Sequence, residues 1–192
     1  MAGSTLSFAK SGLVGDGINQ QKPHSPGSTS RDGVTEESFQ IVEFLLGQEH
    51  FGINLFDVKE VVEYSRITRL PNSPAYIKGI IDLRGEISTI IDLKQQLAIV
   101  DSAVSDEKES RIIVLDDRLT HARIGIMVDE VLTVSTYNVS QVDKTATSGD
   151  DGTHILGIIK KTVREKEREK TQLVIWLDIK GLVQNMEQSG DR

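Results

Sequence analysis

The side chains best suited to acid–base or metal chemistry are two adjacent carboxylates and four scattered histidines. Asp129 and Glu130 follow an apolar alternation over residues 124–128 that predicts a strand. Neighbouring strand residues point to opposite faces, so these carboxylates cannot act as a pair on one substrate. No two histidines are close in sequence, so packed or solvated histidines are a better interpretation than a metal site. The four are His24, His50, His121 and His154.

Nucleophilic and phosphate chemistry find no support either. The chain has no cysteine, which excludes thiolate nucleophiles, disulfides and Cys-based metal sites. The glycines of residues 12–17 lack the spacing of a dinucleotide or Walker loop, and no strand precedes them. Residues 143–153 read as a flexible loop that lacks the spacing of a calcium-binding loop. We therefore predict no catalytic residue, no cofactor and no bound metal.

Composition narrows the possible partners. A net charge of -7 repels phosphate backbones, so we expect no nucleic-acid partner. No run approaches the roughly 18 apolar residues of a membrane span, and the first 20 residues lack the layout of a signal peptide. We expect a cytoplasmic protein with no direct membrane insertion.

Arg84 is the best candidate for binding chemistry. Apolar residues alternate with polar ones over residues 81–83, and the same alternation resumes over residues 87–91, which predicts two antiparallel strands joined at Arg84 and Gly85. Glycine suits a turn position with positive φ. The turn would direct outward a planar guanidinium with five donors. A solvated turn residue without a role is the alternative interpretation.

Several elements must hold this hairpin. Residues 39–46 predict a strand buried on both faces, followed by a turn into residues 50–53. Residues 55–63 are ambiguous between helix and strand, with a polar side that includes Glu60. Pro71 and Pro74 predict a pinned, non-helical connection into the hairpin.

A strand closed by an aspartate and followed by a short amphipathic helix occurs twice. Asp92 is a suitable N-cap before one helix and Asp178 before another. The second helix carries an apolar stripe that we expect to cover a barrel end. The repetition suggests two similar halves. The stripe consists of Ile179, Leu182, Val183 and Met186.

Two polar runs predict connections. Residues 101–110 are rich in Asp, Glu and Ser and indicate an exposed link between the halves. Residues 160–170 carry six positive and three negative side chains and indicate a solvated tip between two paired strands. A basic tip on an acidic protein is also able to steer an acidic partner.

The central motifs together resemble the CheW family of chemotaxis coupling proteins. The signature consists of Pro71, Pro74, Gly79, the Leu83-Arg84-Gly85 turn and Ile91-Asp92-Leu93. Further matches, in the same order, cover the opening hairpin, Val58 to Val62, Gly125 to Val131 and Leu173 to Val183. The resemblance spans roughly residues 39–186.

The resemblance implies an all-β fold of two SH3-like five-stranded β-barrel subdomains with short helices. We expect a disordered tail at residues 1–38, a CheW-like domain at residues 39–188 and a frayed end at residues 189–192. The first barrel would take roughly residues 39–100 plus the C-terminal helix. The second would take roughly residues 110–177.

The resemblance also implies a non-enzymatic adaptor. Its partners would be the cytoplasmic tips of methyl-accepting chemoreceptors and the regulatory domain of a CheA-type histidine kinase, in arrays at the membrane. The positions that match the family's binding region are Val58, Glu60, Gly79, Arg84 and Gly85. Asp82 departs from the asparagine that the family often has there.

The sequence leaves three alternative functions open. One is a CheW-like scaffold of a chemosensory pathway that does not serve motility. A small β-barrel enzyme is disfavoured because no nucleophile with its base is evident. A nucleic-acid binder is disfavoured because the strands are poor in aromatic residues.

Overall fold

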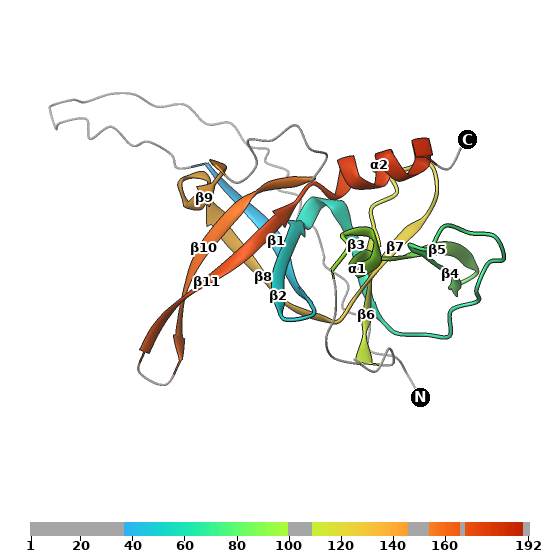
Figure 1. The fold of residues 1–192 in the computed structure, drawn as a ribbon, viewed down its shortest axis with the longest axis horizontal. Helices are drawn as coiled ribbons and strands as arrows, with labels where there is room; N and C mark the ends of the chain where they lie inside the picture. The colour runs from blue at the N-terminus through green and yellow to red at the C-terminus, as the bar shows by residue number, and fades with distance from the viewer. Residues whose placement is uncertain (1–36, 100–108, 146–153, 166–167, 190–192) are drawn as a thin grey trace, which may run out of the picture.

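The fold consists of two β-sheets with short helices (Figure 1). The computed structural model describes residues 37–99, 109–145, 154–165 and 168–189. The expected mainly β architecture with short helices is therefore confirmed. Residues 1–36 of the expected tail, all but the end of the 101–110 link, most of the 143–153 loop and residues 190–192 lie outside the described residues, whereas Ser38 already belongs to a strand and Ser189 still belongs to a helix.

The six-stranded sheet combines strands from both ends of the described chain. Its neighbours pair antiparallel, except that β2 and β11 run parallel. Its order is β8 (Glu130–Asn138), β1 (Ser38–Leu46), β2 (Glu49–Asn54), β11 (Arg168–Leu177), β10 (Ile155–Glu165) and β9 (Val142–Asp143).

The five-stranded sheet comes from the middle of the chain. Only β5 and β7 pair parallel. Its order is β3 (Val58–Glu63), β6 (Arg111–Leu115), β7 (Ile124–Val128), β5 (Glu86–Asp92) and β4 (Ile77–Leu83). The helices that lie wholly within the described residues are η1 (Leu55–Asp57), α1 (Leu93–Gln96), η3 (Val139–Gln141) and α2 (Ile179–Ser189).

The two sheets do not divide the chain where the sequence suggested. The expected halves were residues 39–100 with the C-terminal helix and residues 110–177. In the structure the first hairpin lies in one sheet with the last strands, and β3 to β7 form the other. The reason is long-range pairing: β1 lies beside β8, and β2 lies beside β11. Local alternation predicts a strand without naming its partner.

Three apolar clusters fill the described structure. The largest lies between the sheets and receives the α2 stripe, whose four members are at most 7 % exposed. The stripe that the sequence predicted is thus confirmed, and it stabilises by about 1.5–3 kcal/mol per large side chain. One smaller cluster belongs to each sheet.

The predicted N-cap of α1 is also present, since Asp92 Oδ1 accepts a hydrogen bond from the Gln95 N–H at 3.3 Å.

The five-stranded sheet curls until its two edge strands approach each other. By hydrogen-bond order β3 and β4 lie at opposite edges. Beyond β3, however, Thr68 exchanges two backbone hydrogen bonds with Ile80 of β4, at 2.9 and 2.8 Å. This closure brings side chains of β3 close to the β4–β5 turn. The ambiguous segment before it is resolved as η1 followed by a strand.

The charged run of residues 160–170 is not the connection that the sequence suggested. β10 and β11 stay paired as far as Glu165 opposite Arg168, so the run belongs to a long two-stranded ribbon. We call residues 160–165 and 168–173 the β10–β11 ribbon. It extends away from the rest of the sheet (Figure 1). The sequence did not predict a strand in this run because its residues are mostly charged and lack the apolar alternation that usually indicates a strand.

Candidate functional site

Arg84 lies at the apex of a two-residue turn between β4 and β5. Leu83 pairs with Glu86, and both turn residues have positive φ, 56° at Arg84 and 85° at Gly85. Positive φ at both central positions is the mark of a type I′ turn, whose twist matches that of the flanking strands. The predicted hairpin is therefore confirmed. Its apex holds the Arg84 backbone in a conformation that a non-glycine residue rarely adopts.

Asp82 stabilises this turn. Its Oδ1 accepts a hydrogen bond from the Gly85 N–H at 2.6 Å. An aspartate that bonds the backbone a few residues further on is a common device for fixing a turn. The departure from asparagine at this position therefore keeps the acceptor oxygen and adds a negative charge near Arg84.

Glu60 of β3 reaches Arg84 across the closed sheet. The Arg84 Nη2 to Glu60 Oε2 distance is 3.3 Å. The Glu60 side chain is 15 % exposed, whereas that of Arg84 is 71 % exposed. Glu60 is thus largely buried and contacts one side of a guanidinium that is otherwise mostly exposed to solvent. An exposed pair of this kind contributes only about 0–1 kcal/mol to stability, so its main effect is on orientation.

Gly79 makes the approach of the two edges possible. Its φ is +146°, and a Cβ placed there would lie 2.3 Å from the Thr68 carbonyl oxygen. No other residue fits without moving this backbone. Gly79 is buried, so its place in the site is to let the sheet close beneath Glu60 and Arg84.

Val58 lies apart from the exposed part of the site. It is 3 % exposed and belongs to the cluster between the sheets. A register shift in β3 separates it from Glu60. The five residues singled out from the sequence therefore divide into Glu60, Arg84 and Gly85 at the surface and Val58 and Gly79 beneath it.

Two exposed apolar side chains were missed by the sequence reasoning. Ile87 is 58 % exposed and lies directly across the hairpin from Asp82. Phe56, 60 % exposed, lies in η1, immediately before β3. The exposure of Ile87 could not be read from the alternation, because alternation gives a face without saying whether another element covers it.

The two adjacent carboxylates considered for catalysis differ in their surroundings. Asp129 lies between β7 and β8, where Oδ2 accepts from the Gly47 N–H and Oδ1 contacts Lys94 Nζ, both at 2.6 Å. Glu130 is exposed. Within the described ranges no group of three or more His, Cys, Asp or Glu side chains could hold a metal ion.

A buried carboxylate in the six-stranded sheet was also missed. Glu43 is 1 % exposed and accepts from the Tyr137 hydroxyl at 2.7 Å and from Lys161 Nζ at 2.9 and 3.0 Å. Burial raises the pKa of Glu43, but hydrogen bonds from Ser135, Tyr137 and Lys161 outweigh it, so the pKa lies below its usual value. Burial and the same carboxylate raise the pKa of Tyr137. The network joins β1, β8 and β10.

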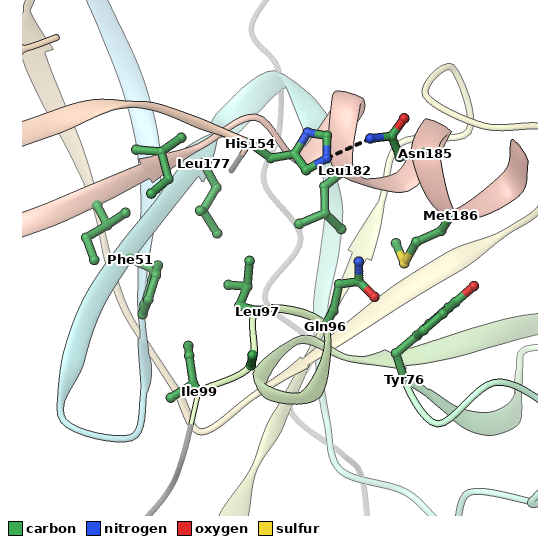
Figure 2. A pocket seen from close by; sticks show the side chains of 13 residues that line it. Phe51, Tyr76, Gln96, Leu97, Ile99, His154, Leu177, Leu182, Asn185 and Met186 are labelled. Atoms are coloured by element: carbon green, nitrogen blue, oxygen red, sulfur yellow. Dashed lines mark hydrogen bonds between the residues drawn. The ribbon is translucent and has the colours of Figure 1, made fainter. Parts of the chain in front are cut away.

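A separate cavity of about 740 Å³ is lined by residues of β2, β11 and α2 and by the segment at the end of α1 (Figure 2). Phe51, Leu97, Ile99 and Leu177 are among its apolar walls, and α2 contributes Leu182 and Met186. At its rim Asn185 hydrogen-bonds His154 at 2.9 Å. The volume falls within the range of small-ligand sites. The Arg84 turn does not line this cavity.

Comparisons with known proteins agree with this architecture. A family model described as a CheW-like domain matches residues 40–187. A chemotaxis protein CheW from Treponema pallidum is 31% identical over 159 residues, covering 80% of this chain and 87% of the relative. That from Thermotoga maritima is 28% identical over 158 residues, covering 82% and 95%.

The fold is also similar to a solved structure. The crystal structure of scaffolding protein TtCheW from Thermoanaerobacter tengcongensis aligns with a TM-score of 0.62 and 29% identity. The alignment covers 80% of this chain and 93% of that chain. Among the residues that the structure describes, no helix is long and apolar enough to cross a membrane.

Proposed function

The chain belongs to the CheW-like family of chemotaxis proteins, and from this premise we propose that it is an adaptor between chemoreceptors and a kinase. It couples the cytoplasmic tips of methyl-accepting chemoreceptors to the regulatory domain of a CheA-type histidine kinase. It works in the cytoplasm, recruited to receptor arrays at the membrane. Like the scaffolding proteins of its family, it is not an enzyme.

The observation that carries this proposal is the held but exposed guanidinium of Arg84. Glu60 fixes one side of the side chain and the I′ turn fixes its backbone, while 71 % of the side chain stays open to solvent. A partner therefore meets an arginine that has already lost part of its freedom, which lowers the entropy cost of binding. Ile87 adds exposed apolar area on the same hairpin.

Binding calorimetry with two purified partners tests this function. We expect saturable binding of a receptor cytoplasmic fragment and of the kinase regulatory domain, each weakened by a substitution at Arg84. Binding of neither partner would contradict the adaptor proposal. Binding of both that ignores Arg84 would retain the adaptor but reject the proposed site.

A further inference from the structure

We propose that the outer face of the β10–β11 ribbon, together with the adjoining cavity, is a docking surface for an acidic protein segment that carries apolar side chains. The ribbon is distant in sequence from the Arg84 site. The proposal concerns this second surface and does not depend on the adaptor function.

The ribbon extends beyond the strands that flank its base. β9 pairs with β10 only at Ile158 and Ile159, and β2 pairs with β11 only from Val174 to Trp176. In the described part of the chain, residues 160–165 and 168–173 therefore pair only with each other. The ribbon runs away from the other strands of the sheet (Figure 1).

One face of the ribbon is fixed to the body at its root. Residues directly opposite in an antiparallel pair share a face, so Lys161 and Gln172 lie on the same side as the buried pair Ile159 and Val174. Lys161 bonds buried Glu43, and Gln172 bonds His50 of β2. These contacts fix which face the ribbon presents outward.

The outer face has an apolar centre and cationic neighbours. Leu173, 51 % exposed, lies opposite Lys160, and the next pair outward is Thr162 with Thr171. Arg164 follows, with a side chain that is 86 % exposed. Lys160 and Arg164 contact Asp143 and Glu169, but exposed ion pairs of this kind are worth about 0–1 kcal/mol and are easily exchanged.

This face continues toward the cavity. One pair inward from Leu173, Ile158 lies opposite Ile175, and Ile175 and Ile155 both line the 740 Å³ cavity. Leu156, 38 % exposed, lies on β10 between Ile155 and Ile158. An apolar path therefore runs from the cavity to the exposed Leu173.

The positive charge of the ribbon indicates that the partner segment is acidic. The run of residues 160–170 has six cationic and three anionic side chains on a chain of net charge -7, and the described charged residues of the outer face itself are Lys160, Arg164 and Glu169. An acidic segment is attracted to the ribbon, whereas most of the remaining surface repels it. Lys- and Arg-rich edge strands resist addition of another strand, so the face around Leu173 is the better contact than the edges.

Amide NMR of the isotope-labelled full chain tests the proposal. The probe is a short synthetic peptide of glutamate and serine with two leucines. We expect shifts at residues 156–164 and 169–175. Leu173→Ser and Lys160→Glu should each weaken binding by about tenfold, a typical loss for one contact at an interface. Leu132→Ser is the matched control, since Leu132 is 38 % exposed on β8, and it should bind like the wild type.

Two further probes identify the chemistry. The same peptide with lysine in place of glutamate, or with serine in place of leucine, should not bind. The proposal is overturned if the acidic peptide shows no binding at millimolar concentration, or if Leu173→Ser binds unchanged while its melting curve matches that of the wild type. It is equally overturned if the ribbon binds phosphatidylglycerol vesicles in preference to the peptide.

Discussion

At the residue scale, the recognition chemistry of Arg84 depends on a backbone conformation that disfavours arginine. A left-handed conformation costs a non-glycine residue roughly 1–2 kcal/mol, and Asn tolerates it better. Arg84 with φ 56° thus keeps a functional side chain where Asn or Gly would be more stable. Such local strain is frequent at functional sites.

Arg84→Asn should therefore separate stability from binding. We expect the free energy of unfolding to rise by up to about 1 kcal/mol, because Asn-Gly is a preferred pair for a I′ turn. Affinity for the receptor fragment and the kinase domain should fall. Urea denaturation and calorimetry measure the two effects. A variant that is less stable than the wild type would contradict the strain argument.

Glu43 predicts an acid-sensitive contribution to stability. Its folded pKa is depressed below the usual 4.5, so the stabilisation is present above 4.5 and is lost as pH falls through the lower, folded value. Glu43→Gln should lower the free energy of unfolding at pH 7 by about 2 kcal/mol, since bonds to a charged group are lost.

Urea denaturation at a series of pH values checks this prediction. The variant should lack part of the decline that the wild type shows below about pH 5, where unfolded glutamates take up protons. Parallel curves for the two proteins would show that Glu43 is not the titrating group.

Sequence reasoning found Arg84 but missed Glu43, and the reason is physical. Arg84 and Gly85 are marked by a local turn pattern. Glu43 lies in an otherwise apolar strand, and its partners Tyr137 and Lys161 are about 94 and 118 positions away in sequence. No local sequence pattern predicts a side-chain hydrogen bond between residues so far apart in the chain.

At the element scale, the closure of the five-stranded sheet depends on Gly79. Gly79→Ala should destabilise by about 3 kcal/mol or more, because its Cβ would meet the Thr68 carbonyl at 2.3 Å and φ is +146°. Gly85→Ala is a matched control: φ is +85°, but a Cβ there meets nothing within 4 Å, so about 1 kcal/mol is expected. Chemical denaturation compares them, and equal losses would reject a steric role for Gly79.

The hairpin was predictable as an element, but its contact with β3 was not. Alternation around Gly85 predicts β4, the turn and β5. The approach of Glu60 depends on curling of the sheet, which the backbone bonds between Thr68 and Ile80 complete. Glu60 and Gly79 were therefore selected from the family resemblance and not from spacing.

At the scale of the whole molecule, the two sheets share one core and should unfold together. The cluster between them contains residues of both sheets and of α2. Leu182→Ala, at a site 1 % exposed, should cost about 3 kcal/mol, whereas Gln184→Ala on the exposed side of α2 should be nearly neutral.

Two probes should report the same midpoint for Leu182→Ala. Trp176, the one tryptophan of the chain, reports on the six-stranded sheet by fluorescence, and circular dichroism reports on both sheets. Separate midpoints would show that the two sheets unfold independently.

The division of the chain between the sheets was the least predictable feature. The β1–β2 hairpin is read from its own sequence, but its partners β8 and β11 lie far along the chain. A strand's choice of neighbour is decided by the whole set of apolar faces, whereas the expected split at residues 100–110 was read from local composition along the chain.

The most direct test of the central claim compares Arg84→Ala with the wild type in binding and in melting. An exposed turn side chain contributes within about 0.5 kcal/mol to stability, so the melting curve should stay in place. Binding of the receptor fragment or the kinase regulatory domain should weaken by roughly thirtyfold, about 2 kcal/mol, with only partial rescue in Arg84→Lys because an ammonium lacks the bidentate fork. Equal binding by wild type and variant, or a variant that unfolds, would contradict the account.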